Sequence, residues 1–224
     1  MVIDQPSVLF YPQPFRHRFV SEGEDGAELV CATLEFGAGM LNPLMRALPE
    51  VLVVPLASAT ALQPTIDLFF AEAFAELPGR QTAVDRLAEY FLVLLLRAAM
   101  NARLVQGGAL MGLGDARLAR ALHAMHERPE YPWSLQQLAQ AAGMSRPRFA
   151  AYFKRIVGVT PFDYFTDWRI GLAQSLLRKG ESLKSVAPAV GFASSTALSR
   201  AFSRRLGESP AAWLSRYCST YDEK

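Results

Sequence analysis

The sequence predicts an α+β N-terminal part, with short strands and two helices, followed by an all-α part of two helix-turn-helix units joined by a long helix. Three observations predict this fold class. Short apolar runs of the strand type lie before residue 57, and residues that cap helices recur from Asp115 onward. In addition, one segment of the second half, 138–161, is repeated in 186–210.

The N-terminal part begins with three predicted strands. Val8–Phe19 and Ala27–Phe36 are rich in Val, Leu and Phe and flank an acidic turn, and Val51–Leu56 is a third apolar run. A helix is predicted over 61–77, with Pro64 tolerable only near its start, and a second helix is predicted from Thr82. The second helix carries apolar residues at helical spacing, so strands followed by a helix pair are expected.

Glycines interrupt the chain after the helix pair and predict a linker over 107–114. The sequence therefore predicts an N-terminal domain over 1–106, the linker, a helical domain over 115–217 and a tail over 218–224. Side chains that cap helix N-termini predict where the helices of the second domain begin, at Asp115, Ser134, Ser145, Thr160, Ser182, either Ser194 or Ser195, and Ser209. Glycines predict most of the ends, so this domain is expected to be helical throughout.

The repeated segment, 138–161 and 186–210, indicates what the helical half does. Its two copies share eight identical residues: Ala139/Ala187, Ala141/Ala189, Gly143/Gly191, Ser145/Ser194, Phe153/Phe202, Arg155/Arg204, Gly158/Gly207 and Pro161/Pro210. In each copy small alanines allow two helices to cross closely, a glycine permits a positive φ at the turn, and a serine caps the second helix. Each copy is therefore predicted to be a helix-turn-helix unit.

The second helix of each copy is predicted to turn a polar and basic face outward. That face contains Arg146, Arg148, Ala150, Ala151, Lys154 and Arg155 in the first copy, and Ser195, Thr196, Ser199, Arg200, Ser203 and Arg204 in the second. Residues 1–115 hold 7 Lys and Arg against 13 Asp and Glu, whereas 116–216 hold 15 against 6. A net charge of about −6 beside one of about +9 indicates that the helical half meets a polyanion.

The helical half resembles the AraC/XylS-type transcription regulators over about 100 residues. The signature of their second unit is matched by VAPAVGFASSTALSRAFSRRLGESPAAW (186–213), and their first unit by LAQAAGMSRPRFAAYFKRIVGVTP (138–161). The resemblance implies binding to double-stranded DNA near promoters and control of transcription, usually through contacts with RNA polymerase. The long helix between the copies is expected to hold the two recognition helices about one helical turn of DNA apart, ~34 Å.

The resemblance also assigns positions. Base-reading sites of the first recognition helix fall on Pro147, Ala150 and Ala151, which limits direct readout there to apolar contacts or to the neighbouring arginines. In the second unit they fall on Thr196 and Arg200, with Arg200 suited to a guanine edge. Phosphate contacts are expected from Arg155, Arg204 and Arg205. Pro188 departs from the family pattern and removes a backbone bond unless it lies in the first turn of its helix.

The N-terminal part resembles, less specifically, the later part of the cupin-like sensory domain of one branch of this family. The family domain is longer, so a partial barrel with unprotected strand edges is expected. Three explanations stay open: the chain is a fragment, it starts downstream of the natural start, or it dimerises through the helix pair. A small-molecule effector is conceivable, with His17 as a weak candidate contact. The expected protein is a cytoplasmic, nucleoid-associated activator that forms a dimer.

Other residues favour structural roles. His123 and His126 lie three apart without a third ligand, so no metal site is expected, and Cys31 is expected to be buried. No catalytic arrangement or cofactor motif is found, so neither an enzyme nor a cofactor is expected. No apolar run is long enough to span a bilayer, so no membrane segment is expected. Two rival hypotheses remain: a protein-interaction module whose basic face is incidental, and a small-molecule sensor or enzyme in the N-terminal half.

Overall fold

The structure is a computed structural model that describes residues 2–13, 18–20, 29, 31–34, 42–105 and 107–221, with side chains described as far as Arg216. The chain divides into two compact units. The N-terminal unit takes its described residues from Met1–Glu35 and Leu48–Val105, and the C-terminal unit from Phe36–Ala47 and Gln106–Lys224. The predicted fold class, α+β followed by all-α, is confirmed.

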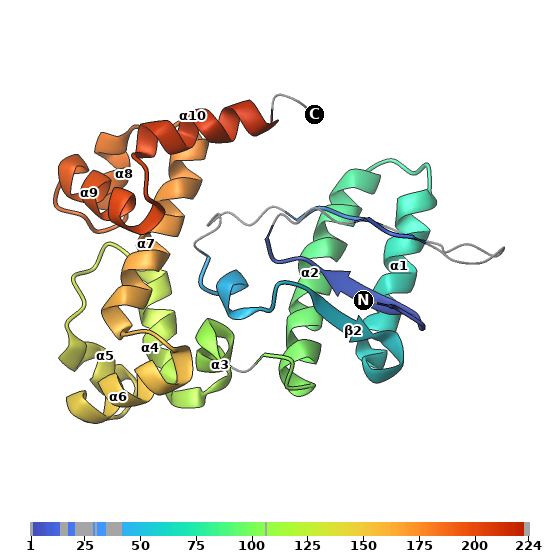
Figure 1. Ribbon diagram of the computed structural model, residues 1–224, viewed down its shortest axis with the longest axis horizontal. Coiled ribbons are helices and arrows are strands. Elements are labelled where there is room, and N and C mark those ends of the chain that lie inside the picture. The colour runs from blue at the N-terminus through green and yellow to red at the C-terminus, as the bar shows by residue number, and fades with distance from the viewer. Residues whose placement is uncertain are drawn as a thin grey trace. The chain divides into compact units, whose positions relative to one another are not determined.

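The N-terminal unit contains a two-stranded antiparallel sheet and a helix pair (Figure 1). Strand β1 (Ser7–Phe10) pairs with β2 (Leu52–Pro55), with Ser7 opposite Pro55 and Phe10 opposite Leu52. Alternate residues of β2, Leu52 and Val54, are buried, as expected of a strand with one face on a core. Two 3₁₀ turns lead to α1 (Gln63–Phe74), which packs along α2 (Arg80–Asn101).

Where the structure describes them, the two long predicted strands are shorter than expected. Of the described residues of the first run, 8–13, 18 and 19, only residues 8–10 lie in a strand, and Pro12, which has no N–H to donate, follows two residues later. Residues 31–34 of the second are irregular and largely exposed, and Cys31 is exposed where a buried residue was expected. An apolar run becomes a strand only where a second strand completes its hydrogen bonds, and in the described residues only β2 does so for β1.

The C-terminal unit is helical, as Figure 1 shows. Its helices are α3 (Gly108–Gly114), α4 (Ala116–Glu127), α5 (Leu135–Ala141), α6 (Arg146–Val157), α7 (Pro161–Arg178), α8 (Leu183–Ala189), α9 (Ser195–Leu206) and α10 (Pro210–Tyr221). The predicted caps at Asp115, Ser134 and Thr160 form, and Ser134 with Gln137 makes a reciprocal capping box. Capping chemistry is local, which explains why these helix starts were predictable.

The predicted linker is helical instead. Helix α3 packs on α4 and α6, and Ala109 and Leu110 are buried. A Cβ at Gly112 would lie 2.9 Å from both Leu122 Cδ1 and Val157 Cγ2, so this glycine permits close packing rather than flexibility. The short turn Met45–Ala47 also contacts α3, which places residues 42–47 in the C-terminal unit and not in the predicted domain over 1–106.

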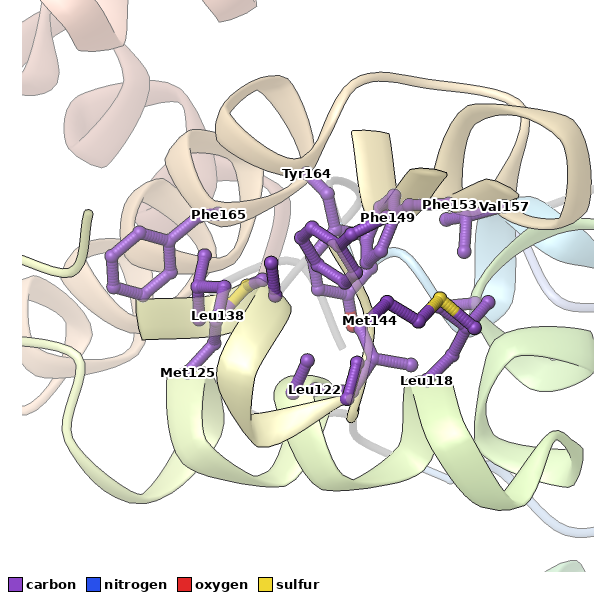
Figure 2. Close-up of a cluster of buried hydrophobic side chains, with 14 residues drawn as sticks. Leu118, Leu122, Met125, Leu138, Met144, Phe149, Phe153, Val157, Tyr164 and Phe165 are labelled. Carbon is purple, nitrogen blue, oxygen red and sulfur yellow. The ribbon is translucent and has the colours of Figure 1, made fainter. Parts of the chain in front are cut away.

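Each half of the C-terminal unit has its own core. The first is shown in Figure 2 and is built from α4, α5, α6 and the start of α7, with Leu118, Leu122 and Phe153 fully buried. The second gathers the rest of α7 with α8, α9 and α10 around Phe202. Helix α7 contributes side chains to both cores, so the long helix predicted between the two copies joins them physically.

Candidate nucleic-acid interface

The two predicted helix-turn-helix units are α5–α6 and α8–α9. The turn glycines have positive φ angles, 65° at Gly143 and 79° at Gly191, as predicted. Ala139 and Ala187 are fully buried where the helices cross. Ser194 accepts a hydrogen bond from the Ala197 amide at 3.1 Å and caps α9.

Ser145 lies at the corresponding position and α6 begins directly after it, as predicted. Its side chain makes no capping hydrogen bond, so the predicted cap is wrong there. In each unit the second helix buries an apolar stripe and leaves the opposite side in solvent.

The side chains predicted for the outward face lie there. On α6 the exposed residues are Arg146, Pro147, Arg148, Ala151, Lys154 and Arg155, with Ala150 half-buried. On α9 Thr196, Arg200 and Arg204 are exposed, and Ser195, Ser199 and Ser203 are half-buried. Each face is as wide as one helix and carries cations beside small side chains, which is the shape and charge that a major groove accepts.

A hydrogen bond joins α6 to the start of α4. The Tyr152 hydroxyl donates to Asp115 Oδ2 at 2.5 Å, and the same carboxylate caps α4 by accepting from the Arg117 and Leu118 amides. These hydrogen bonds lower the pKa of Asp115, although burial opposes them, so the carboxylate stays charged. The Arg155 guanidinium lies 4.9 Å from the Tyr152 ring centroid. This link between α4 and α6 could not be predicted from the sequence, because Tyr152 and Asp115 lie far apart in the chain.

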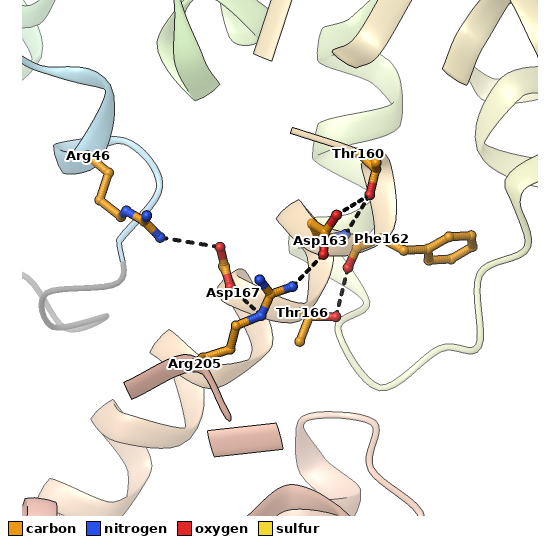
Figure 3. A network of polar contacts seen from close by, with 7 residues as sticks. All are labelled: Arg46, Thr160, Phe162, Asp163, Thr166, Asp167 and Arg205. Atoms are coloured by element: carbon orange, nitrogen blue, oxygen red, sulfur yellow. Dashed lines mark hydrogen bonds and ion pairs between the residues drawn. The ribbon is translucent and has the colours of Figure 1, made fainter. Parts of the chain in front are cut away.

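Arg205 is half-buried and its guanidinium contacts α7. Its Nη2 donates to Asp163 Oδ1 at 2.6 Å, and its Nε lies 3.1 Å from Asp167 Oδ1 (Figure 3). Thr160 donates its hydroxyl to Asp163 Oδ2 at 2.6 Å, and these hydrogen bonds from Thr160 and Arg205 lower the pKa of Asp163. Arg205 was expected to hold a phosphate. The structure instead ties it to α7, which charge patterning alone could not indicate.

Asp167 has a second cationic neighbour. Arg46 Nη1 donates to Asp167 Oδ2 at 3.4 Å, so the carboxylate lies between two guanidinium groups (Figure 3). Burial nevertheless raises the pKa of Asp167, outweighing both arginines. Neither Arg46 nor Asp167 was singled out from the sequence.

Pro188 lies in the last turn of α8, not the first. It is exposed and cannot donate a backbone hydrogen bond to the Lys184 carbonyl. The helix ends directly after it, at Ala189, and the turn at Gly191 follows, so the missing bond falls where α8 is already ending.

His126 is a structural residue of the first unit. Its ring stacks on Trp168 with centroids 3.8 Å apart, and its Nε2 lies 2.7 Å from the Tyr164 hydroxyl. Burial, helped by the charge of His123, lowers the pKa of His126 to about 4. The folded protein therefore keeps this imidazole neutral at neutral pH.

The pH dependence of stability follows from this shift. An unfolded His126 takes up a proton near pH 6.5, whereas the folded one does so only near pH 4. We therefore expect the free energy of unfolding to be unaffected by His126 above pH 6.5 and to fall by up to about 3 kcal/mol between pH 6.5 and 4. Urea denaturation across this range measures it. His126→Gln should remove this pH dependence. His123→Gln, at an exposed site, should keep most of it, because burial is the larger cause of the shift. Equal slopes in both variants would refute the assignment.

His17, the candidate effector contact, lies outside the described residues. Within the described part of the chain, no group of three or more His, Cys, Asp or Glu side chains is placed to hold a metal ion. Among the helices that the structure describes, none is both long and apolar enough to cross a bilayer.

Comparison with known proteins matches both parts of the chain. A family model described as a cupin matches residues 1–101, and one described as a helix-turn-helix domain matches residues 138–216. A putative AraC-like transcription regulator from Streptomyces lividans is 35% identical over 192 residues, which cover 83% of this chain and 62% of that protein. The chain thus spans less than two thirds of that relative's length.

Two further proteins are similar. An uncharacterized HTH-type transcriptional regulator from Haemophilus influenzae is 29% identical over 211 residues, covering 94% of this chain and 70% of that protein. The crystal structure of the DNA-binding domain of AdpA, a global transcriptional factor, in complex with a target DNA, is 32% identical with a TM-score of 0.46. That match covers 49% of this chain and 100% of that one.

Proposed function

Since this chain is a relative of the AraC-like transcription regulators, we propose that it binds specific sequences of double-stranded DNA and controls transcription. One observation carries the proposal: two helix-turn-helix units, joined by one helix, each expose a cationic second helix. That geometry supports insertion of α6 and α9 into adjacent segments of the major groove. The protein acts by binding and has no enzymatic role in this proposal.

The two recognition helices contribute differently in this proposal. Arg200 is exposed one turn after the start of α9 and has the donors to bind the O6 and N7 atoms of a guanine. Arg155 and Arg204 lie near the C-terminal ends of their helices, exposed and suited to phosphates. Pro147, Ala150 and Ala151 offer only apolar contact, so α6 relies on Arg146, Arg148 and Lys154 for polar contacts.

Selection from a random pool of duplex DNA tests the function directly. The full chain should enrich one sequence with two separated half-sites, and the affinity should fall steeply as salt rises, because bound phosphates release counterions. Enrichment of no sequence, or binding that is insensitive to salt, would favour the rival hypothesis of a protein-interaction module.

Arg200→Ala and Arg204→Ala form a matched pair on the selected duplex. Arg200→Ala should cost about 1–3 kcal/mol of binding free energy and relax the preference at one base pair, because a base contact is lost. Arg204→Ala should weaken binding to all sequences alike and reduce the slope of log affinity against log salt by about one. Fluorescence anisotropy on the duplex and its single-base variants measures both. If Arg200→Ala weakens all duplexes equally, Arg200 does not read a base.

The N-terminal unit is proposed to form a homodimer. Large apolar side chains are exposed on and just after α1, at Leu68, Phe70, Phe74 and Leu77, and on α2 at Tyr90 and Val93. A second copy that covers these residues would remove them from water. Sedimentation of the full chain measures its oligomeric state, and Phe74→Glu should shift it toward monomer.

The proposal of a transcription regulator has further parts. They are a small-molecule effector in the cupin-like part, contact with RNA polymerase, activation of transcription, and a cytoplasmic, nucleoid-associated location.

A further inference from the structure

Helix α7 belongs to both helix-turn-helix units. Tyr164 and Phe165, in its first turns, are buried in the first core, and Ile170, Ala173 and Leu177 are buried in the second. The separation of the two recognition helices along DNA therefore depends on how firmly each unit is held to α7. Apolar side chains alone allow small rotations and shifts, whereas directional polar contacts restrict them.

Arg169 of α7 is bound to the first unit. Its Nε donates to the Pro129 carbonyl at 2.6 Å and its Nη2 donates to the Tyr131 carbonyl at 2.9 Å, both in the loop between α4 and α5. Its guanidinium also lies 4.0 Å from the centroid of the Phe165 ring. A planar, forked group held by two carbonyls and one ring has little freedom to turn.

The turn of the second unit lies against the same group. A Cβ on Gly191 would be 2.5 Å from Arg169 Nη2 and 2.6 Å from the Pro129 carbonyl oxygen. The absence of a side chain at Gly191 thus lets the α8–α9 turn approach both Arg169 and the loop of the first unit. The two helix-turn-helix units therefore contact each other directly, in addition to being joined through α7.

The far end of α9 has a separate attachment. Arg205, in its last turn, is ion-paired with Asp163 and Asp167 near the start of α7 (Figure 3). The Arg169–Gly191 contact is at the turn before α9, and the Arg205 pair is at its end. Two attachments at opposite ends of one helix restrict both its position and its rotation.

We propose that these two contacts, the Arg169–Gly191 contact and the Arg205–Asp163/Asp167 ion pairs, set the number of base pairs that the protein requires between its two half-sites. The proposal rests on the proposed DNA binding. One inserted base pair moves a half-site by ~3.4 Å along the DNA axis and turns it by about 35°. A rigid pair of recognition helices cannot follow such a displacement, whereas a loosened pair can.

The test uses the full chain and the selected duplex, with one base pair inserted or removed between the half-sites. Wild type should lose at least ~10-fold in affinity on either altered duplex, because only one unit can then bind well. Arg169→Ala should bind the original duplex more weakly and lose less than ~3-fold on the altered ones. Arg169→Lys, which keeps the charge without the fork, should fall between them.

Lys184→Ala is the control, since it removes an exposed charge of α8 outside both contacts and should keep the wild-type ratio between duplexes. Circular dichroism establishes that each variant is folded. If Arg169→Ala does not fold, Arg205→Gln decides by the same ratio. If a folded Arg169→Ala or Arg205→Gln protein shows the wild-type ratio of affinities for the original and altered duplexes, this inference is wrong but the proposed function stands. If the wild-type chain selects no DNA sequence, the proposed function itself is wrong.

Discussion

Gly191→Ala is expected to lower the free energy of unfolding of the C-terminal unit by about 2–5 kcal/mol. At a φ of 79° an alanine costs about 1–2 kcal/mol, because its Cβ crowds the following carbonyl. The new Cβ would also lie 2.5 Å from Arg169 Nη2 and 2.6 Å from the Pro129 carbonyl oxygen. Overpacking of this kind costs about 1–3 kcal/mol more, since a backbone atom cannot turn aside as a flexible side chain can.

Gly207→Ala is the matched control for Gly191→Ala. Gly207 ends α9 with the same φ, 79°, and a Cβ there would meet nothing within 4 Å. This variant should therefore lose only the conformational part, about 1–2 kcal/mol. Urea denaturation followed by circular dichroism measures both. Equal losses in the two variants would show that the turn of the second unit does not pack tightly against Arg169.

Phe202→Ala should destabilise the second unit by about 3–5 kcal/mol, since Phe202 is fully buried at the centre of its core. Its ring packs edge-on against Trp213, with centroids 5.7 Å apart. A loss of this size is a large fraction of the stability of a domain, about 5–15 kcal/mol. DNA binding should fall with it, because α9 would no longer be held on α7 and α8.

The first unit should survive that substitution, because Phe202 belongs to the second core alone. Near-ultraviolet circular dichroism can follow this, with signal from Trp133 and Trp168 in the first unit and from Trp213 in the second. Phe162→Ala, at a residue 45% exposed, is the control and should cost less than about 1 kcal/mol. If Phe202→Ala and Phe162→Ala shifted one common unfolding transition by the same amount, Phe202 would not be a core residue.

The helices of the C-terminal unit were predictable because their signals are local. A serine, threonine or aspartate satisfies amides two or three residues away, and glycines with positive φ follow the ends of α6 and α9, at Gly158 and Gly207. The internal repeat added the helix-turn-helix pairing and the outward face of each second helix. Residues such as Arg200 and Lys154 are exposed as predicted. Their contacts with DNA stay predictions.

The N-terminal unit and the linker were predicted less well, because their structure depends on partners distant in sequence. The run Val8–Phe19 could not reveal that its strand ends at Phe10, where its pairing with β2 ends. The glycines of 107–114 indicated flexibility, whereas Gly112 allows α3 to pack closely against Leu122 and Val157. Glycine serves both purposes, and only the neighbouring atoms distinguish them.

By itself the sequence determined the two basic helix-turn-helix units, because caps, turns and apolar spacing act within a few residues of each other. Only the tertiary structure decided which cations are free to meet DNA and which hold the protein together. Arg204 and Arg205 are neighbours in the chain, yet one is exposed and the other is bound to two carboxylates of α7. The physical reason is that an ion pair depends on where a distant helix brings its carboxylates, which neither composition nor periodicity encodes.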